Sequence, residues 1–385
     1  MNGTPRSERL HIGVFGKRNA GKSSLLNAIT GQKTAVVSDV KGTTTDPVYK
    51  AMELLPIGPV VLIDTAGTDD IGEVGELRLE KTRSVLRKTD FALLVANAEE
   101  GLSPEDIRLI SRFEEMGILY LIVYNKYDIS TAAPREDGIS VSAKTGMGIE
   151  ALKEKIAAIN AAGENPPLVS DLINAGDTVI LVIPIDESAP RGRLILPQQQ
   201  VIRDILDSGA IAIATRETEF SQTLIKLAAP PKLIITDSQA FKRVEEETPK
   251  NVRLTSFSIL LSRYKGALET AIIGAAALDE IRDDDIILIS EACTHHRQCD
   301  DIATKKLPRL INEYTKAAPK YEFTSGGDFP SDLRKYKLAI HCGACMINRR
   351  EMQFRQKSAV DANVPITNFG VAIAFVLGIL ERCKL

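Results

Sequence analysis

One segment near the N-terminus restricts the possible folds of this chain more than any other. Residues 10–16 form a short apolar run, residues 16–23 read GKRNAGKS, and the stretch that follows has the apolar spacing of a helix. The loop matches the pattern G-x-x-x-x-G-K-S/T in the strand–loop–helix context that this pattern requires. Its glycines allow backbone N–H groups to point at phosphate oxygens, and the helix N-terminus adds positive potential. The sequence therefore predicts a phosphate-binding loop in an α/β domain with a mostly parallel sheet.

Individual residues of this segment have defined roles in binding a nucleotide. Lys22 is expected to reach the β- and γ-phosphates, and the Ser23 hydroxyl is expected to coordinate Mg²⁺. Gly16, Gly21 and Ser24 are expected to contact the nucleotide from the loop and from the first helical turn. The segment thus predicts a site for a nucleotide with its magnesium ion.

Two further segments supply groups for the γ-phosphate. The apolar run VVLIDTAG at residues 60–67 places Asp64 beside the metal and the N–H of Gly67 at the γ-phosphate. In KGTTTDP at residues 41–47, Thr44 is the expected second hydroxyl ligand of Mg²⁺, ordered only when γ-phosphate is bound, although its two threonine neighbours are alternatives. The residues expected to take part in hydrolysis are Lys22, Thr44, Asp64 and Gly67.

The base is predicted to be guanine. The apolar run LYLIVYNKYD at residues 119–128 ends in Asp128, whose carboxylate can accept hydrogen bonds from the guanine N1–H and 2-amino group. Adenine lacks this pair of donors, so the site should bind GTP in preference to ATP. In ISVSAKTG at residues 139–146, the backbone is expected to support guanine O6. The residues expected at the base are Asn125, Lys126, Asp128, Ser142, Ala143 and Lys144.

Asn19 connects the loop to one branch of GTPases. With an asparagine at this position, the loop resembles that of the potassium-activated GTPases of the TrmE/Era type, a branch of the Ras-like class. This branch includes tRNA-modifying and ribosome-assembly members. That resemblance implies a K⁺ ion near the phosphates, bound in part by Asn19, that stimulates Mg²⁺-dependent GTP hydrolysis by supplying the charge an arginine supplies elsewhere. The alternative is that Asn19 only shapes the turn.

Composition restricts the location and the partners of the chain. The formal net charge of −3 gives no general reason to bind nucleic acid or an anionic membrane. The apolar stretch at residues 364–380 is interrupted by polar residues and is predicted to be a buried helix rather than a membrane span. An odd, clustered set of five cysteines, in a chain that opens without an apolar leader, is typical of a reducing compartment, so a cytoplasmic location is expected.

The remaining sequence predicts two more α/β domains. An amphipathic helix closes the first domain, and residues 164–168, ENPPL, have the composition of a linker. The next segment alternates apolar strands with helical stretches and has no pattern typical of catalysis, which favours a role in assembly. The three predicted domains are residues 1–163, 170–262 and 265–385.

All five cysteines lie in the last quarter of the chain, and three of them form a pattern with histidines. The pattern is Cys293-x-His295 followed by His341-Cys342-x-x-Cys345. Two apolar strands end on these cysteines, and parallel neighbouring strands would bring them to one edge of a sheet, where α/β folds bind ligands. Three kinds of site remain open: a thioredoxin-like dithiol, a zinc site and an iron–sulfur cluster.

The combination of motifs resembles one family over essentially the whole chain. A phosphate-loop GTPase with GTTTDP at residues 42–47, a middle segment without catalytic motifs and C-x-H…H-C-x-x-C are together similar to the [FeFe]-hydrogenase maturation GTPases, the HydF family. The resemblance implies a GTPase domain, a dimerisation domain and a C-terminal domain that binds a [4Fe–4S] cluster through Cys293, Cys342 and Cys345.

The resemblance also implies a function and partners. Such a protein is a scaffold and carrier for the diiron subcluster, which two radical-SAM maturases help to build and which is then delivered to the hydrogenase apoprotein. The protein is expected to form a homodimer or a higher oligomer of itself. The fourth cluster position is left open, and the candidates for it, or for a supporting role around the cluster, are Glu291, His295 and His341.

Two other functions remain open. The main alternative is an RNA- or ribosome-directed GTPase with a structural zinc domain, which would bind nucleic acid with an affinity that falls as salt rises. The second is a GTP-regulated thiol oxidoreductase, whose activity should survive replacement of Cys293. Loss of iron on that replacement would favour the iron–sulfur hypothesis over both.

Overall fold

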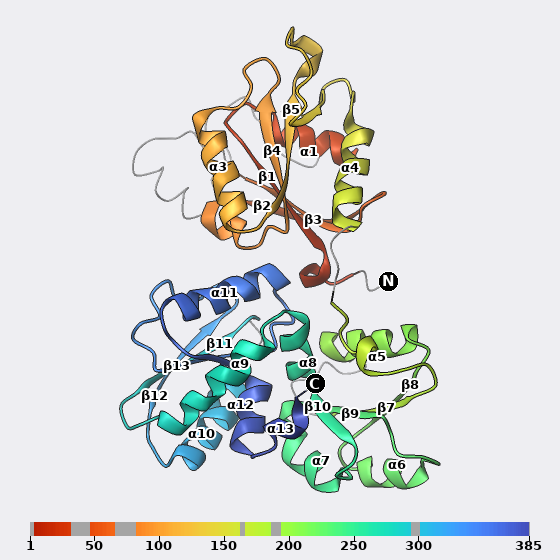
Figure 1. The fold of residues 1–385 in the computed structure, drawn as a ribbon, viewed down its shortest axis with the longest axis vertical. Coiled ribbons are helices and arrows are strands. Elements are labelled where there is room, and N and C mark those ends of the chain that lie inside the picture. The colour runs from red at the N-terminus through yellow and green to blue at the C-terminus, as the bar shows by residue number, and fades with distance from the viewer. Residues whose placement is uncertain are drawn as a thin grey trace. The chain divides into compact units, whose positions relative to one another are not determined.

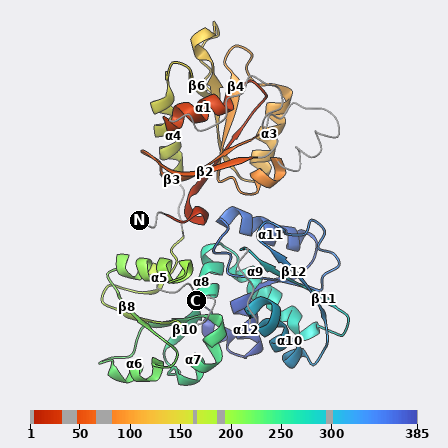
Figure 2. The same cartoon turned by 180° about the vertical axis from the view of Figure 1, so that it is seen from behind.

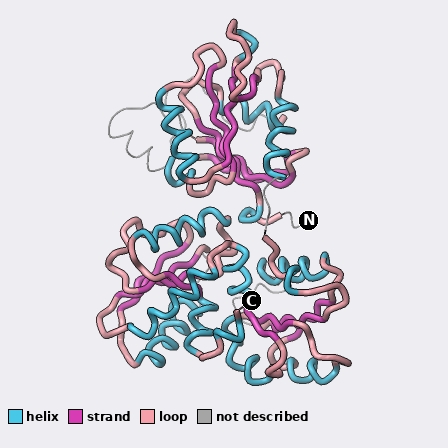
Figure 3. Tube along the Cα trace, in the orientation of Figure 1, coloured by secondary structure: helices cyan, strands magenta, loops and turns pink. Residues whose placement is uncertain are grey.

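The computed structural model describes residues 4–31, 47–65, 82–161, 166–185, 194–293 and 301–384. Within these ranges the chain divides into two compact units, Met1–Asn165 and Pro166–Leu385 (Figure 1). Both units are built from sheets covered by helices, as the second view and the secondary-structure colouring show (Figures 2 and 3). The predicted α/β class with parallel sheets is confirmed.

The first unit is a six-stranded sheet in the order β2-β3-β1-β4-β5-β6, in which only β2 runs antiparallel to its neighbour. Helices α1 and α4 contribute to the apolar core on one face, and α3 to the core on the other. Coverage on both faces explains why the central strands are mostly apolar rather than alternating. The elements are β1 Leu10–Phe15, α1 Lys22–Thr30, β2 Val48–Leu54, β3 Gly58–Asp64, β4 Phe91–Asn97, α3 Pro104–Glu115, β5 Leu119–Asn125, β6 Gly138–Ser140 and α4 Ile149–Ala161.

Helix α3 illustrates how local sequence sets an element boundary. The Ser103 side chain accepts the backbone N–H of Asp106 at 3.2 Å, and the Asp106 carboxylate accepts the backbone N–H of Ser103 at 3.0 Å. Pro104 occupies the first helical position, where its missing N–H is not needed. The residues around Ser103 therefore set where α3 begins.

The second unit contains two four-stranded parallel sheets, β10-β9-β7-β8 and β12-β11-β13-β14. The first has β7 Thr178–Val182, α5 Leu196–Asp207, β8 Ile211–Thr215, α6 Phe220–Lys226, β9 Leu233–Thr236, α7 Phe241–Glu247, β10 Arg253–Ser256 and α8 Phe257–Tyr264. The second has α9 Leu268–Ala275, β11 Ile286–Glu291, α10 Leu307–Thr315, β12 Lys320–Ser325, β13 Leu338–His341, α11 Arg349–Asp361, β14 Ile366–Asn368, α12 Phe369–Val376 and α13 Leu380–Cys383. Short 3₁₀ helices lie at Arg6–Glu8, Tyr127–Ile129, Ser170–Leu172, Ser238–Ala240 and Ala276–Glu280, and a π-helical turn lies at Ile302–Lys306.

Three elements of this unit were missed or misassigned from sequence. Strands β10 and β12 were not predicted, and β12 pairs with β11 on the side opposite β13. The segment at residues 364–380, predicted as one buried helix, begins with strand β14, and α12 starts only at Phe369. The Asn368 side chain ends the strand and caps the helix, since it accepts the backbone N–H of Gly370 at 2.8 Å. An apolar run alone does not distinguish a buried strand from a buried helix.

The two sheets of the second unit share one apolar core. A single cluster of buried side chains includes Ile180 and Ile234 from the first sheet and Ile289 and Ile340 from the second. Helix α8 packs against α9 and α12 at this junction. The two predicted domains of this region are therefore packed as one body.

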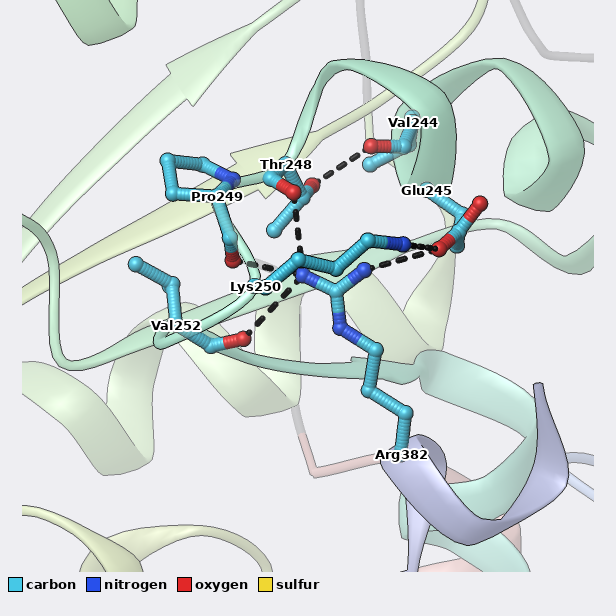
Figure 4. A network of polar contacts seen from close by, with 7 residues as sticks. All are labelled: Val244, Glu245, Thr248, Pro249, Lys250, Val252 and Arg382. Atoms are coloured by element: carbon cyan, nitrogen blue, oxygen red, sulfur yellow. Dashed lines mark hydrogen bonds and ion pairs between the residues drawn. The ribbon is translucent and has the colours of Figure 1, made fainter.

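The C-terminal helix α13 joins the two halves of the second unit by a partly buried polar network (Figure 4). The Arg382 guanidinium donates to the Glu245 carboxylate at 2.9 Å and to the carbonyls of Thr248 at 3.0 Å and Pro249 at 2.6 Å. Next to it, Cys383 is completely buried in the shared core. The network attaches the last helix to the loop between α7 and β10.

Among the described residues, no helix has both the length and the apolar character needed to cross a membrane.

Candidate functional site

The phosphate-binding loop lies between β1 and α1, and two of its glycines are required by close contacts. Gly16 has φ +134°, and a Cβ there would lie 2.2 Å from the Val95 carbonyl oxygen. Gly21 has φ +93°, and a Cβ there would lie 2.3 Å from the amide nitrogen of Asn125. Both positions exclude larger residues. The half-buried Ser24 lies in the first turn of α1.

The residues predicted to bind phosphate and magnesium lie together. The Lys22 ammonium donates to the carbonyls of Gly16 and Lys17, each at 2.8 Å, so it lies over the loop. The Ser23 hydroxyl donates to one carboxylate oxygen of Asp64 at 2.7 Å. The other oxygen, Oδ1, is buried and accepts no hydrogen bond.

The surroundings of the Asp64 carboxylate suit a metal site. Burial raises its pKa, and the Ser23 hydroxyl and the Lys22 charge act in the opposite direction. A buried carboxylate with one unused oxygen, next to a hydroxyl at a phosphate loop, fits the oxygen ligands that Mg²⁺ prefers. Thr44 and Gly67, predicted to complete this site, lie outside the described residues.

The predicted guanine site is assembled from two loops that follow β5 and β6. The Asn125 amide nitrogen donates to the carbonyl of Ala20 at 3.0 Å, and its oxygen accepts the N–H of Ala143 at 3.0 Å. The Ser142 hydroxyl donates to the Asp128 carboxylate at 2.7 Å. These bonds link the phosphate loop to both loops predicted to bind the base, so one asparagine positions three segments.

The other residues predicted around the nucleotide are accessible. Lys126 adopts the left-handed conformation at φ +64°, and Lys144 is exposed. Asn19 is also left-handed, at φ +62°, and lines a cavity of about 200 Å³ beside the loop. Lys126 and the buried Asp106 contribute to the same cavity.

One residue of this region was missed from sequence. The Glu99 carboxylate accepts the Ser130 hydroxyl at 2.7 Å, the N–H and hydroxyl of Thr131 at 2.7 and 2.9 Å, and the N–H of Ala132 at 3.3 Å. These bonds lower the pKa of Glu99 to about 2. The acceptor thus holds the turn directly after Asp128, and only the fold brings the two segments together.

The cysteine motif lies at the ends of two paired strands. Strands β11 and β13 are parallel neighbours, with Ser290 in register with His341. Cys342 follows β13 directly, and Cys293 follows β11 by two residues. The strand pairing that would bring the motif to one sheet edge is confirmed, although the connection includes β12 as well as α10.

Cys342 is held in a defined orientation. Its sulfur accepts the backbone N–H of Ala292 at 3.1 Å and that of Ala344 at 3.4 Å. Ala344, between the two cysteines of the motif, is left-handed at φ +59° and brings its N–H toward the sulfur. Burial raises the pKa of the Cys342 thiol, and the two N–H groups act against this effect. Backbone N–H groups directed at sulfur are the hydrogen bonds that tune iron–sulfur ligands.

The donor set fits an iron–sulfur cluster in chemistry and in connection. Cys293, Cys342 and Cys345 are thiols rather than disulfides, on loops that leave neighbouring strands. Among the described residues, no three histidine, cysteine or acidic side chains already form a metal-binding group. Thiolates repel one another, and a metal offsets that repulsion on binding, so ligand sites commonly form together with the metal.

The residues predicted as candidates for the fourth ligand of the cluster differ in their surroundings. In His341, Nδ1 lies 2.9 Å from the Cys342 carbonyl and Nε2 lies 3.1 Å from the Arg355 guanidinium, so both ring nitrogens are engaged. Burial and then the Arg355 charge lower the pKa of His341 to about 3. Glu291 is buried at the end of β11. His295 lies outside the described residues.

The first half of the second unit also contacts the cysteine loop. Cys345 packs against the apolar cluster that contains Leu260 and Leu261 of α8. Lys265 is only 1% exposed, and its ammonium donates to the carbonyl of Ile347 at 3.0 Å. The loop is therefore supported from α8 as well as from its own sheet.

These two sites define the class: a phosphate-loop GTPase domain joined to an α/β unit with a three-cysteine motif. Comparison with family models agrees for each part. The hydrogen maturase F dimerization domain matches residues 168–266, the hydrogen maturase F tetramerization domain matches residues 269–384, and the 50S ribosome-binding GTPase family matches residues 11–126. The chain therefore belongs to the hydrogen maturase F family of hydrogenase maturation GTPases.

Two curated relatives each match about two fifths of this chain. The tRNA modification GTPase MnmE of Methylorubrum populi is 39% identical over 172 residues, which are 43% of this chain and 37% of the relative. GTPase Der of Wolinella succinogenes is 35% identical over 165 residues, 38% of this chain and 35% of the relative. The chain thus spans about a third of the length of these relatives. Among solved structures, Aquifex aeolicus Era bound to GDP·AlF₄⁻ has a TM-score of 0.36 and 19% identity, covering 54% of this chain and 92% of Era.

Proposed function

We propose that this chain is a GTP-hydrolysing scaffold and carrier that binds a [4Fe–4S] cluster and delivers the diiron subcluster to [FeFe]-hydrogenase apoprotein. The observation that carries the proposal is the pairing of β11 with β13, which directs Cys293 and Cys342 from neighbouring parallel strands, in a chain of the hydrogen maturase F family. The two N–H···S bonds to Cys342 support a thiolate at that position.

In the GTPase half, Lys22 binds the β- and γ-phosphates while the Ser23 hydroxyl coordinates Mg²⁺. The Asp64 carboxylate accepts a hydrogen bond from the Ser23 hydroxyl, which leaves the lone pairs of the Ser23 oxygen directed at the metal. Asp128, held by Ser142, selects guanine. Thr44 and Gly67 complete the γ-phosphate site, and Asn19 is the K⁺ ligand that gives hydrolysis its dependence on potassium.

In the cysteine half, Cys293, Cys342 and Cys345 are the cluster ligands. A cluster held by three thiolates supplies one iron whose fourth ligand can exchange, which is the property a carrier needs to bridge to a second metal unit. Glu291 and His295 are the candidates for that position. His341 suits a supporting role, because ligation would break one of its two hydrogen bonds.

The partners follow from the family. They are the hydrogenase apoprotein, which receives the diiron cargo, and two radical-SAM maturases, which help to build it. Self-association is supported by the dimerization and tetramerization domains that match the second unit. A cytoplasmic location is part of the proposal, since the thiols that hold the cluster require reducing conditions.

The test is the metal content of protein purified and reconstituted without oxygen. The wild type is expected to hold about four irons and four sulfides per chain, with the EPR signal of a reduced cluster, and Cys293→Ala is expected to lose them. Cys383→Ala is the matched control, because that thiol is buried in the apolar core and burial raises its pKa to about 12. Loaded wild type should then activate hydrogenase apoprotein.

The result that contradicts the proposal is equally specific. Stoichiometric zinc in a colourless protein, even after reconstitution with iron and sulfide, would favour a GTPase with a structural zinc domain. The names of the MnmE relatives would then suggest RNA as a partner, although the similarity covers only 43% of this chain.

A further inference from the structure

A buried arginine lies behind the cysteine site. Arg355 of α11 is 0% exposed. Its guanidinium donates through Nε to Glu351 at 3.2 Å and through Nη2 to the carbonyl of Gly326 at 2.7 Å, and it lies 5.2 Å from the centroid of the Phe329 ring. Burying a charge costs several kcal/mol unless it is well paired. An apolar residue at position 355 would avoid that cost. The presence of an arginine there therefore requires a reason other than stability.

The remaining contact of Arg355 determines the tautomer of a histidine. Nη1 lies 3.1 Å from Nε2 of His341. Arginine has donors and no acceptor, so Nε2 must accept the hydrogen bond. The ring proton of His341 is therefore on Nδ1, which donates to the Cys342 carbonyl at 2.9 Å. Arg355 thus acts on Cys342 through an imidazole of fixed orientation.

This contact completes the set of hydrogen bonds around Cys342. Its N–H donates to the Ser290 carbonyl at 2.9 Å, its carbonyl accepts from His341, and its sulfur accepts from Ala292 and Ala344. Neighbouring residues at a strand end point to opposite faces of the sheet. Here His341 contacts Arg355 of α11, whereas Cys342 packs against the shared core and against a smaller cluster that includes Met352 of α11. The hydrogen-bonded link from Arg355 to Cys342 therefore runs through the His341 ring to the Cys342 carbonyl.

We propose that Arg355 is a positioning residue of the cluster site, which fixes the orientation of the Cys342 peptide through the Nδ1–H tautomer of His341 and so keeps the N–H···S bonds in place. The inference rests on the proposed function, because it assigns Cys342 as a cluster ligand. Glu351 is the counter-ion that allows the guanidinium to remain buried: its Oε1 accepts from Arg355, and its buried Oε2 accepts no hydrogen bond.

The first test needs no cluster. The chain contains four histidines, so ¹⁵N-histidine labelling gives a spectrum that a His341→Gln variant can assign. Wild-type protein is expected to show His341 as the Nδ1–H tautomer. An Nε2–H tautomer in the wild type would overturn the inference without any further variant.

The second test uses Arg355→Met combined with Glu351→Gln, which removes both buried charges and leaves none unpaired. After reconstitution, this variant is expected to show a more negative cluster reduction potential, because the N–H···S bonds weaken. Its affinity for iron, measured against a chelator, is expected to fall about 10–100-fold. Lys357→Met, on the exposed side of the same helix, is the matched control and should match the wild type.

The outcomes separate this inference from the proposed function. A wild-type protein that takes up no iron overturns the proposed function and, with it, the role given to Arg355. A wild type that binds the cluster, beside a double variant with the same potential and iron affinity, overturns the inference alone. If the double variant fails to fold, His341→Gln with the same two measurements decides the question, because it breaks the same contact.

Discussion

The nucleotide site and the cysteine site are supported in different ways. Around the phosphate loop, each functional segment contributes its own ligands, and a few side chains such as Asn125 tie neighbouring loops together. Around Cys342, the thiol is supported by residues from other elements, among them the fully buried Arg355. The first site is a set of recurring local motifs, whereas the second depends on packing at the edge of a sheet. Changes at one site should therefore leave the other intact.

The largest expected effect is on nucleotide choice. Asp128→Asn removes the carboxylate expected to accept two guanine donors and should weaken GTP binding about a hundredfold or more. Binding of a fluorescent GTP analogue measures the effect. Iron content should not change, and Cys293→Ala should bind GTP as the wild type does. Loss of iron in Asp128→Asn would show that the two sites are not separable.

The next effect is on the stability of the second unit. Arg382→Ala removes a mostly buried guanidinium from several acceptors and should lower the free energy of unfolding of this unit by about 3 kcal/mol. Urea titration followed by circular dichroism measures the change, and GTP binding by the first unit should persist. Lys384→Ala is the control, since its pair with Glu381 is exposed and worth little. Equal stability of the two variants would contradict the role given to this network.

A smaller effect concerns potassium. Asn19→Ala should remove the difference between hydrolysis in K⁺ and in Na⁺, about tenfold or about 1.4 kcal/mol in the barrier. Steady-state phosphate release at equal ionic strength measures the rates. Lys17→Ala, in the same loop, is a useful comparison because its side chain pairs with Glu105. Full K⁺ stimulation in Asn19→Ala would restrict that residue to shaping the turn.

The smallest effect is expected at Glu99 and depends on pH. Its pKa is lowered from 4.5 to about 2 in the folded protein, so its hydrogen bonds stabilise the fold fully above the unfolded value. That contribution is lost as the pH falls from about 4.5 toward 2. Glu99→Gln should flatten this part of the stability profile and weaken GTP binding only a fewfold, since the group is exposed. The neighbouring Glu100→Gln is the control. If Glu99→Gln left the dependence of stability on acidic pH unchanged, the hydrogen bonds of Glu99 would contribute nothing measurable to stability.

Much of the GTPase half could be predicted because its chemistry is local. The phosphate loop brings its glycines, Lys22 and Ser23 close together in the sequence. Backbone geometry restricts which residue types can occupy these positions. The strand–loop–helix order around them follows from apolar runs and their spacing. Strands β10 and β12 were missed because short or half-exposed strands leave a weak pattern, and β14 was read as helix because its apolar run continues into α12.

By itself, the sequence determined the phosphate loop, the residues expected at the guanine base, the α/β class and the cysteines that end two strands, because each depends on residue type at short spacing. The tertiary structure decided which partners those residues have. The pairing of β11 with β13, the contact of Arg355 with His341 and the clamp of Glu99 on residues 130–132 all join segments far apart in the chain. Such contacts leave no periodic signal, because their stabilisation comes from burial and hydrogen bonding between elements that only the folded chain brings together.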